Sequence, residues 1–218
     1  MGRVFACSDL HGQYDKFLKL KSIMQEDDIC YVLGDCVDRG LGSIKILLEI
    51  VQDERFKMLM GNHEDMMLEA LAAAEEGYMD FQLWYGNGGY QTHMEFMEYD
   101  RETQIKIISF LKKLPYKLEY KDIVLTHAGF SFELEEYVLD DILDEDRLIW
   151  DRSHIKNTAK SKLGKMQVHG HTPTAVIDKR YEGKILQYHE QKICIDTGSC
   201  FGYSLGLIDL DTLEFIYI

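Results

Sequence analysis

The sequence predicts an α/β fold in which a largely parallel sheet is followed by a second sheet of mostly antiparallel strands. In the first third of the 218 residues, short apolar runs alternate with segments of helical periodicity. In the last fifth, apolar runs are separated by Gly, Asp or charged turns. Because alternating strands and helices form βαβ crossovers, the first part is expected to build a parallel sheet.

The first third is expected to hold three buried strands and two helices. Apolar runs predict strands at 3–8 (RVFACS), 29–34 (ICYVLG) and 56–61 (FKMLMG). Apolar residues at near-helical spacing predict helices over 14–25 and 43–52. Each strand ends in a short polar cluster. Since the carboxyl ends of strands carry the functional groups in open α/β sheets, we expect these clusters to converge.

The middle of the chain is expected to be mainly helical. Residues 64–114 include an Ala-rich run, a Gly-rich break at YGNGGY and an amphipathic end before Pro115. We interpret this stretch as a helical cap inserted in a single domain that spans 1–218. Strands resume at YKLEY and DIVLTH, and the acidic segment 133–147 predicts an exposed helix and loop.

The end of the chain, from Met166 on, is expected to contain strands alone. The candidate strands are MQVHGH, KILQYHE, KICIDTG, SLGLIDL and LEFIYI. Turn residues or charged residues separate them, which is typical of antiparallel pairing. We expect these strands to form the second sheet.

The charge balance is strongly acidic. The chain has 24 basic and 38 acidic residues, a formal net charge of −14, which argues against a broad basic surface for nucleic acid. Phosphorylated substrates stay allowed, because bound cations invert the local charge. Apolar runs are far shorter than the roughly 20 residues of a membrane helix, and no export signal is visible. We expect a cytoplasmic protein without membrane contact.

The five cysteines are scattered and contain no CxxC pair. Most lie in or beside apolar strand-like runs. We therefore interpret them as small buried apolar side chains in a reducing compartment.

Polar side chains that follow the predicted strands form a set of nitrogen and oxygen donors. The set is Asp9, His11, Asp35, Asp38, Arg39, Asn62, His63, His127 and His171. Donors of this kind without a thiolate suit Mn²⁺, Fe or Zn²⁺. One shared carboxylate could bridge two cations, the arrangement used for displacement at phosphorus. The sequence therefore predicts a binuclear metal site.

Taken singly, these residues have simpler interpretations. Asp9 could be a helix N-cap, Asn62 could occupy a left-handed turn, and His127 could be an ordinary core histidine. The paired His11 favours a ligand at Asp9, and the following His63 and Glu64 favour one at Asn62, whereas His127 taken alone does not decide between the two roles. His169 and His171 would share a face of an extended segment, so the residues alone do not choose between these two histidines.

Five motifs in order resemble those of the calcineurin-like metallophosphoesterases. They are SDLHG (8–12), GDCVDRG (34–40), GNHE (61–64), THAG (126–129) and GHT (170–172). The DRG after the second motif resembles the phosphoprotein phosphatase branch, in particular its compact bacterial and phage members, as do LIWDR (148–152) and IDTGS (195–199). Ser8 stands where the family usually has glycine. The resemblance implies the two-sheet metallophosphoesterase sandwich, with flanking helices and with metals at the strand ends.

The resemblance also implies two bound divalent metal ions, most simply Mn²⁺, with Fe and Zn²⁺ as alternatives. One ion would have three protein ligands and the other four, with one aspartate shared as the bridge. The ligands would be Asp9, His11 and Asp35 for the first ion, and Asp35, Asn62, His127 and His171 for the second.

Catalytic roles follow from the same resemblance. A hydroxide that bridges the metals would attack the phosphorus in line. His63 would protonate the leaving group, and Asp38 would orient that imidazole. Arg39 and Arg152 would clamp the phosphoryl oxygens. Arg152 in WDRS could instead form an ordinary surface salt bridge.

The implied function is a metal-dependent phosphatase acting on phosphoserine or phosphothreonine in proteins and peptides. An alternative is a symmetrical dinucleoside tetraphosphate hydrolase, which uses the same metal chemistry on nucleoside polyphosphates. An alternative of another class is a catalytically silent binding protein. The intact ligand set argues against the silent protein. The aromatics Trp84, Tyr85 and Tyr90 are interpreted as packing groups of the cap rather than as a substrate platform.

Overall fold

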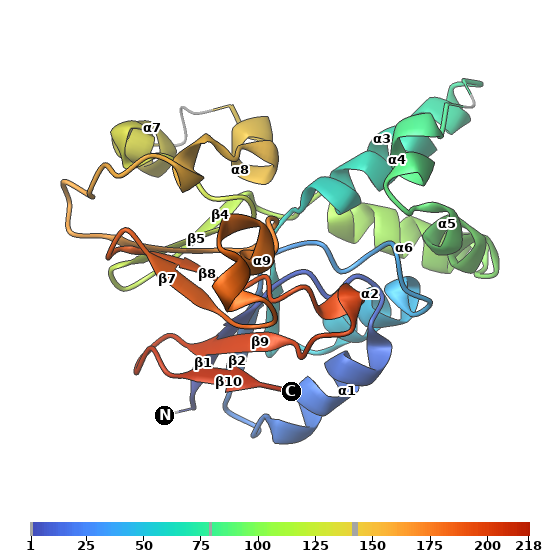
Figure 1. The fold of residues 1–218 in the computed structure, drawn as a ribbon. Helices are drawn as coiled ribbons and strands as arrows, with labels where there is room; N and C mark the ends of the chain where they lie inside the picture. The colour runs from blue at the N-terminus through green and yellow to red at the C-terminus, as the bar shows by residue number, and fades with distance from the viewer. Residues whose placement is uncertain (1, 79, 141–143) are drawn as a thin grey trace.

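The computed structural model describes residues 2–78, 80–140 and 144–218. Two five-stranded sheets pack against each other, and helices cover the outer side of the first sheet (Figure 1). The predicted α/β two-sheet fold with flanking helices is therefore confirmed.

The first sheet has the strand order β10-β9-β1-β2-β3. Its strands are β1 (Val4–Cys7), β2 (Ile29–Val32), β3 (Phe56–Met58), β9 (Gly206–Asp209) and β10 (Phe215–Tyr217). The first three are parallel to one another, whereas β9 is antiparallel to β1 and β10 is antiparallel to β9. Helices α1 (Tyr14–Ile23) and α2 (Ser43–Gln52) connect the parallel strands, as the sequence predicts.

The second sheet has the strand order β4-β5-β6-β8-β7. Its strands are β4 (Lys117–Tyr120), β5 (Ile123–Thr126), β6 (Met166–His169), β7 (Leu186–Tyr188) and β8 (Lys192–Cys194). The central strands β5, β6 and β8 are parallel, and the two edge strands are antiparallel to their neighbours.

The prediction that the last fifth of the chain forms a sheet of its own was wrong. Strands β9 and β10 join the first sheet beside β1, while β4 and β5 contribute to the second, and the short helix α9 (Thr174–Ile177) interrupts the run of strands. The reason lies in β9, which is buried on both faces. Leu207 packs with the helix-side core and Ile208 with the core between the sheets. A strand buried on both faces fits beside β1, and its apolar pattern does not specify that partner.

The apolar core between the sheets draws residues from both of them. It includes Leu33 and Ile208 from the first sheet and its loops, and Leu125, Val168 and Ile193 from the second. All five side chains are fully or almost fully buried. Burying each such side chain contributes about 1.5–3 kcal/mol, so this layer fixes the two sheets relative to each other.

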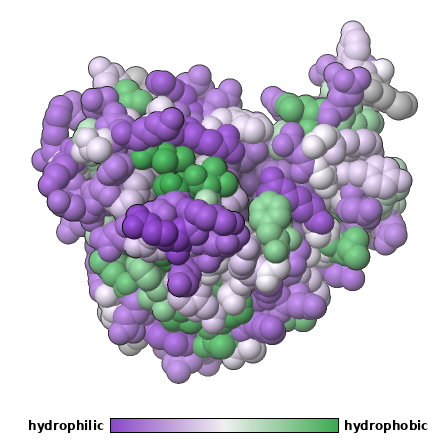
Figure 2. All heavy atoms as spheres, in the orientation of Figure 1, coloured by the Kyte–Doolittle hydropathy of each residue, from purple (hydrophilic) through white to green (hydrophobic). Residues whose placement is uncertain are grey.

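Between β3 and β4 the chain is helical. The helices are α3 (Asn62–Glu75), α4 (Gln82–Gly86), α5 (Tyr90–Met97) and α6 (Arg101–Leu111). Trp84, Phe96 and Ile107 lie in the same apolar cluster as the first sheet. The outer parts of α3 and α4 project from a mainly hydrophilic surface (Figures 1 and 2). The single domain with a cap at about 64–114 stays a prediction.

The acidic segment 133–147 is only partly described, since residues 141–143 lie outside the described residues. Its described parts contain the short helix α7 (Glu135–Leu139) and the start of α8 (Asp146–Trp150). Across the described ranges, no helix combines the length and the apolar character needed to cross a membrane.

Candidate active site

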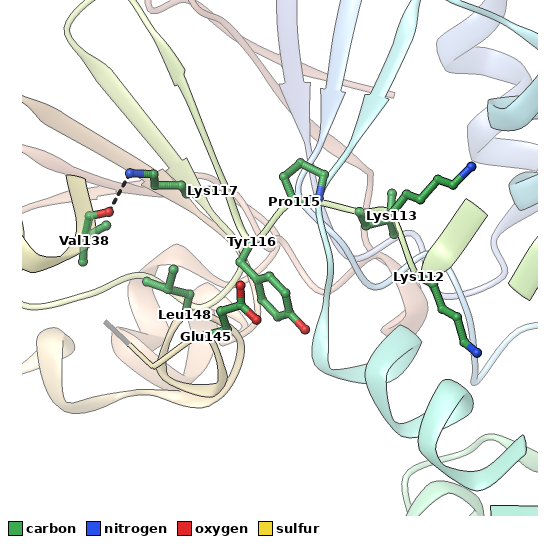
Figure 3. A pocket seen from close by; sticks show the side chains of 9 residues that line it. Lys112, Lys113, Pro115, Tyr116, Lys117, Val138, Glu145 and Leu148 are labelled. Atoms are coloured by element: carbon green, nitrogen blue, oxygen red, sulfur yellow. Dashed lines mark hydrogen bonds between the residues drawn. The ribbon is translucent and has the colours of Figure 1, made fainter. Parts of the chain in front are cut away.

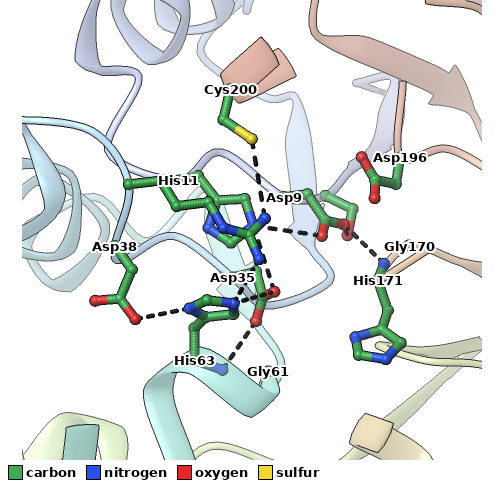
Figure 4. A network of polar contacts seen from close by, with 12 residues as sticks. Asp9, His11, Asp35, Asp38, Gly61, His63, Gly170, His171, Asp196 and Cys200 are labelled. Carbon is green, nitrogen blue, oxygen red and sulfur yellow. Dashed lines mark hydrogen bonds and ion pairs between the residues drawn. The ribbon is translucent and has the colours of Figure 1, made fainter. Parts of the chain in front are cut away.

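The strand ends bring the predicted metal ligands together in one buried cluster, of which Figure 4 shows Asp9, His11, Asp35 and His171. The side chains come from the segments that follow β1, β2, β3, β5 and β6. Their exposed fractions range from 0 to 7%. The members of the cluster are Asp9, His11, Asp35, Asn62, His63, His127 and His171.

Asp35 lies at the centre of this cluster. One carboxylate oxygen lies 3.5 Å from Nε2 of His11, and the other lies 3.3 Å from Nε2 of His127. The Oδ1 atom also accepts the backbone N–H of His63 at 3.1 Å. Burial raises the pKa of Asp35, but the charges of His127 and His63 outweigh burial, so its pKa lies well below the usual value. Asp35 therefore stays ionised between two groups of imidazoles.

The ring nitrogens of the imidazoles are held in fixed directions. The Nδ1 atoms of His11 and His127 contact the carbonyl oxygens of Val37 and Leu33 at 2.8 and 2.6 Å. Because a carbonyl only accepts, the ring proton lies on Nδ1 in both, and Nε2 of His11 is an inward acceptor. Nε2 of His127 instead faces oxygens of Asn62 and Asp35 at 3.0 and 3.3 Å; burial lowers the pKa of His127, but the Asp35 charge outweighs burial and raises that pKa to about 9. His171 Nε2 is buried without any hydrogen-bond partner among the described residues.

The donor set fits divalent metal ions. Nitrogen and carboxylate oxygen atoms lie within 4.8 Å of one another in two groups, His11, Asp35 and His63 in one and Asp35, His127 and His171 in the other. Asp35 belongs to both groups. Buried carboxylates and neutral imidazoles are the ligands of Mn²⁺, Fe and Zn²⁺ sites, and Nδ1 of His171 lies 3.0 Å from Oδ1 of Asn62, another predicted ligand of the same ion.

Asp9 lies at the edge of the first group. Its Oδ1 atom is 3.8 Å from Nε2 of His11, and its Oδ2 atom accepts the backbone N–H of His171 at 2.9 Å and the Ser8 hydroxyl at 2.5 Å. Burial and the neighbouring Asp35 charge raise the pKa of Asp9. The crowding of two buried carboxylates is the electrostatic setting that a cation relieves.

His63 and Asp38 form a hydrogen-bonded pair beside the cluster. Nδ1 of His63 lies 2.7 Å from Oδ2 of Asp38, and both side chains are buried. Burial lowers the pKa of His63, but the charges of Asp35 and Asp38 outweigh it, so the pKa lies above its usual value. Nε2 of His63 lies on the side of the ring away from Asp38 (Figure 4), where it accepts from Nη2 of Arg39 at 3.0 Å. The pair therefore fixes the His63 ring, with the Nδ1 proton on Asp38 and Nε2 facing Arg39.

The two predicted arginines differ in their surroundings. Arg39 reaches the cluster, with Nη1 2.7 Å from Nε2 of His11 and Nη2 3.0 Å from Nε2 of His63. Arg152 is exposed, and its Nε donates to the hydroxyl of Thr172 at 3.2 Å, next to His171. All five thiols are free, four of them buried, and the half-buried Cys200 lies 3.9 Å from Arg39 Nη1.

The site backbone is strained at several ligands and catalytic candidates. The left-handed region, which side chains other than glycine rarely occupy, holds Asp9, His11, Asp35, Asp38, Arg39 and His171, with φ from 43° to 72°. Gly61 is needed for a different reason, since a Cβ there would lie 2.3 Å from Asp35 Oδ1. Such outliers concentrate at functional sites.

Glu64 has a larger role than the sequence indicates. Its buried carboxylate accepts the backbone N–H groups of Asp35, Cys36, Val37 and Gly61 at 2.8 to 3.2 Å. It thereby ties the loop after β2 to the turn before α3. The sequence suggests a helix cap or a partner of the ligands at this position, and it does not show the bonds to the loop after β2.

Two further residues near the site are absent from the sequence-based candidates. The indole N–H of Trp84 contacts both carboxylate oxygens of Asp38 at 3.0 Å. Asp196 is buried beside Asp9, and burial together with the Asp9 charge raises its pKa well above the usual value (Figure 4). The motif IDTGS pointed to the position of Asp196, whereas nothing local in the sequence links Trp84 to Asp38.

A pocket of about 560 Å³ lies elsewhere, between the segment after α6 and helix α8 (Figure 3). Burial and the charges of Asp65 and Glu145 raise the pKa of its Tyr116 to about 12. None of the predicted site residues lines this pocket. We therefore place the chemistry at the buried cluster.

The fold and the cluster together define a metal-dependent phosphoesterase. Residues 2–196 match the family described as calcineurin-like phosphoesterase. The chain belongs to this family, and the resemblance seen in the motifs is confirmed.

Relatives with different substrates share this similarity. The chain is 27% identical over 210 residues to serine/threonine-protein phosphatase 2 of Salmonella typhimurium, covering 91% of this chain and 89% of the relative. It is 25% identical over 138 residues to the symmetrical bis(5'-nucleosyl)-tetraphosphatase of Buchnera aphidicola subsp. Schizaphis graminum, covering 59% and 45%.

Solved structures show the same fold at low sequence identity. A serine/threonine phosphatase from Saccharomyces cerevisiae gives a TM-score of 0.66 at 16% identity, covering 100% of this chain and 79% of its own. A protein provisionally described as a diadenosine tetraphosphatase gives 0.71 at 16% identity, covering 100% and 93%. These similarities establish the architecture, and they do not identify the substrate.

Replacing Glu64 with Gln is expected to loosen the site. Glutamine offers one acceptor oxygen to four N–H groups, and hydrogen bonds to a charged group are worth about 1.5–3 kcal/mol each. We expect the free energy of unfolding, measured by urea titration, to fall by about 2 kcal/mol. Glu69→Gln, at an exposed position of the same helix, should change it by less than about 0.5 kcal/mol. Equal urea midpoints for both variants would contradict the anchoring role.

Proposed function

We propose that the protein is a phosphoprotein phosphatase that hydrolyses phosphoserine and phosphothreonine monoesters with a pair of divalent metal ions. The observation that carries this proposal is the buried His63–Asp38 pair beside the Asp35-centred cluster. The similarity to the Salmonella phosphatase over most of both chains supports the substrate class.

The proposed metal ligands keep the set that the motifs imply. Asp9, His11 and Asp35 would hold one ion, and Asp35, Asn62, His127 and His171 would hold the other. The Asp35 carboxylate shared by two groups of possible ligands supports the bridge, and the inward Nε2 of His11 supports the first ion. The contacts of Asn62 Oδ1 with His127 and His171 support its place at the second. When bound, the ions would supply Lewis-acid polarisation of the phosphoryl group and lower the pKa of a nearby water. We propose Mn²⁺ as the metal in the cytoplasm, because these oxygen and nitrogen donors suit it.

His63 is proposed to protonate the leaving group. Its Nδ1 proton is committed to Asp38, and Nε2 accepts from Arg39 in this structure, so Nε2 would carry the transferable proton once the guanidinium turns to a phosphoryl group. The adjacent carboxylates favour the protonated imidazole, which is the form an acid needs. Asp38 would act through His63 by fixing the direction of the ring.

Arg39 is proposed to bind the phosphoryl oxygens. Its guanidinium contacts the Nε2 lone pair of His11 at 2.7 Å. That lone pair serves one partner at a time, so the guanidinium becomes free for an anion when His11 ligates a metal. Arg152, which donates to Thr172 next to His171, is the second residue proposed to bind the phosphoryl oxygens. Forked donors such as these stabilise the charge of a phosphoryl group in the transition state.

The substrate class is tested by direct comparison of two substrates. We expect the Mn²⁺-loaded protein to release phosphate from a phosphoserine peptide with a higher kcat/KM than it shows for hydrolysis of diadenosine tetraphosphate. Phosphate release and nucleotide chromatography measure the two reactions. A clear preference for the dinucleotide would favour the hydrolase alternative, which the Buchnera relative supports. Absence of both activities would favour a silent binding protein.

His63→Asn is expected to impair esters with poor leaving groups most. Loss of a general acid typically costs about 10²–10⁴ in rate, but a 2,4-dinitrophenolate leaves without a proton. We therefore expect a large fall in kcat for phenyl phosphate and a much smaller one for 2,4-dinitrophenyl phosphate. His189→Asn, at a histidine bonded to the Ile155 carbonyl away from the cluster, is the control. An equal loss on both esters would refute the acid role.

Asp35→Asn tests the shared ligand. A neutral amide cannot replace the bridging charge, so we expect metal content per chain, measured by elemental analysis after dialysis, to fall from two ions to one or none. Asp211→Asn, at an exposed aspartate between β9 and β10, should keep the wild-type content. Retention of two tightly held ions by Asp35→Asn would contradict the bridge.

A further inference from the structure

The helical segment from α4 to α5, residues 82–97, directly contacts residues 33–42, the loop after β2 that carries Asp38 and Arg39 and is called the catalytic loop below. The indole N–H of Trp84 lies 3.0 Å from each carboxylate oxygen of Asp38. Trp84 is 1% exposed and Asp38 is fully buried, so water does not compete for this contact. The hydrogen bond spans 46 residues of sequence.

The same segment also holds the backbone of that loop. The hydroxyl of Thr92 accepts the Asp38 N–H at 2.8 Å, and the carbonyl of Gly88 accepts the Arg39 N–H at 3.1 Å. Asp38 and Arg39 both have left-handed backbones, with φ of 72° and 66°. These contacts come from one segment and act on two neighbouring strained residues, so the segment fixes the conformation of the loop.

The position of the indole is fixed in turn by Gly89. A Cβ at Gly89 would lie 2.3 Å from both Cδ1 and Nε1 of Trp84. The ring therefore packs directly against the backbone of the α5 N-terminus. His93 and Tyr85 pack around it at ring-centroid distances of 5.5 and 6.0 Å. The indole has little freedom to leave Asp38.

The chemistry of the donor suits a carboxylate that must orient a histidine. Tryptophan donates one hydrogen bond and carries no charge. A donor shared between both oxygens fixes the plane of the Asp38 carboxylate, and Oδ2 then faces Nδ1 of His63 at 2.7 Å. The indole N–H therefore orients the carboxylate that binds the His63 ring.

We propose that Trp84 is a positioning residue for leaving-group protonation, and that it acts on His63 through Asp38. This inference rests on the proposed function, in which His63 is the acid. It assigns to the α4–α5 segment the role of a support for the catalytic loop.

The first test removes or displaces the indole N–H. Trp84→Phe keeps an aromatic ring without the donor, and Gly89→Ala keeps tryptophan but drives a methyl group into it. For both variants we expect kcat for phenyl phosphate to fall by about tenfold, the value of one hydrogen bond to a charged group. For 2,4-dinitrophenyl phosphate we expect kcat to fall by less than about fivefold, because the leaving group of that ester needs no proton.

Two control variants separate this effect from general disturbance of the segment. Tyr85→Phe removes a hydroxyl that contacts His93 in the same aromatic group. Gly86→Ala adds a methyl group where no atom lies within 4 Å. Both should keep wild-type rates on both esters. In an Asp38→Ala background, Trp84→Phe should cause no additional loss, because a residue that acts through Asp38 has nothing left to position.

A readout without turnover keeps this inference separate from the proposed function. In ¹⁵N NMR spectra, we expect the His63 imidazole signals, assigned with His63→Asn, to shift in Trp84→Phe and Gly89→Ala but not in Tyr85→Phe. Unchanged His63 signals would overturn the inference, as would equal kinetic losses on the two esters or a full Trp84→Phe effect in the Asp38→Ala background. Failure of the proposed function would appear instead in the wild type, as no ester hydrolysis at all.

Discussion

The carboxylate of Asp35, buried among imidazoles, is the interaction on which the rest of the site depends. An ionised group removed from water is tolerated only when it is paired and hydrogen-bonded. Here His11 and His127 face its two oxygens, and the backbone N–H of His63 binds one of them. Each partner comes from a different strand end, so the two sheets must meet closely at this edge. Glu64 also holds Asp35 in place by accepting its backbone N–H.

Backbone strain is the cost of bringing these groups together. Left-handed residues other than glycine cost on the order of 1–3 kcal/mol each and persist only where the surroundings fix them. For Asp35 the fixing contacts come from Glu64, whereas for Asp38 and Arg39 they come from the α4–α5 segment. The loop after β2 is thus held from two sides. Its strain is maintained by buried hydrogen bonds rather than by the loop sequence itself.

The sequence predicted the parts of the fold and site that depend on local pattern. Polar clusters at strand ends identified Asp9 and His171 among the candidates, and parallel strands necessarily bring such ends together. The partner of β9 was not predictable, because an apolar strand pattern reports burial but not the neighbour. The contact between Trp84 and Asp38 was not predictable for a similar reason. It joins two residues 46 positions apart. The sequence around an aromatic residue near a glycine-rich break is the same whether or not that residue binds a carboxylate in the fold.

The α4–α5 segment therefore has two faces with different constraints. Its inner face holds the catalytic loop through Trp84 and Thr92, and Glu95 extends the contact by accepting N–H groups at the start of α2. Its outer face exposes Leu83 and Tyr90 by 59 and 51%. Substitutions on the outer face leave the inner hydrogen bonds intact, so that face can change to suit a substrate. Substitutions on the inner face are expected to act on His63, the proposed acid, whatever the substrate is, because Trp84 and Thr92 bind Asp38, the residue bonded to His63.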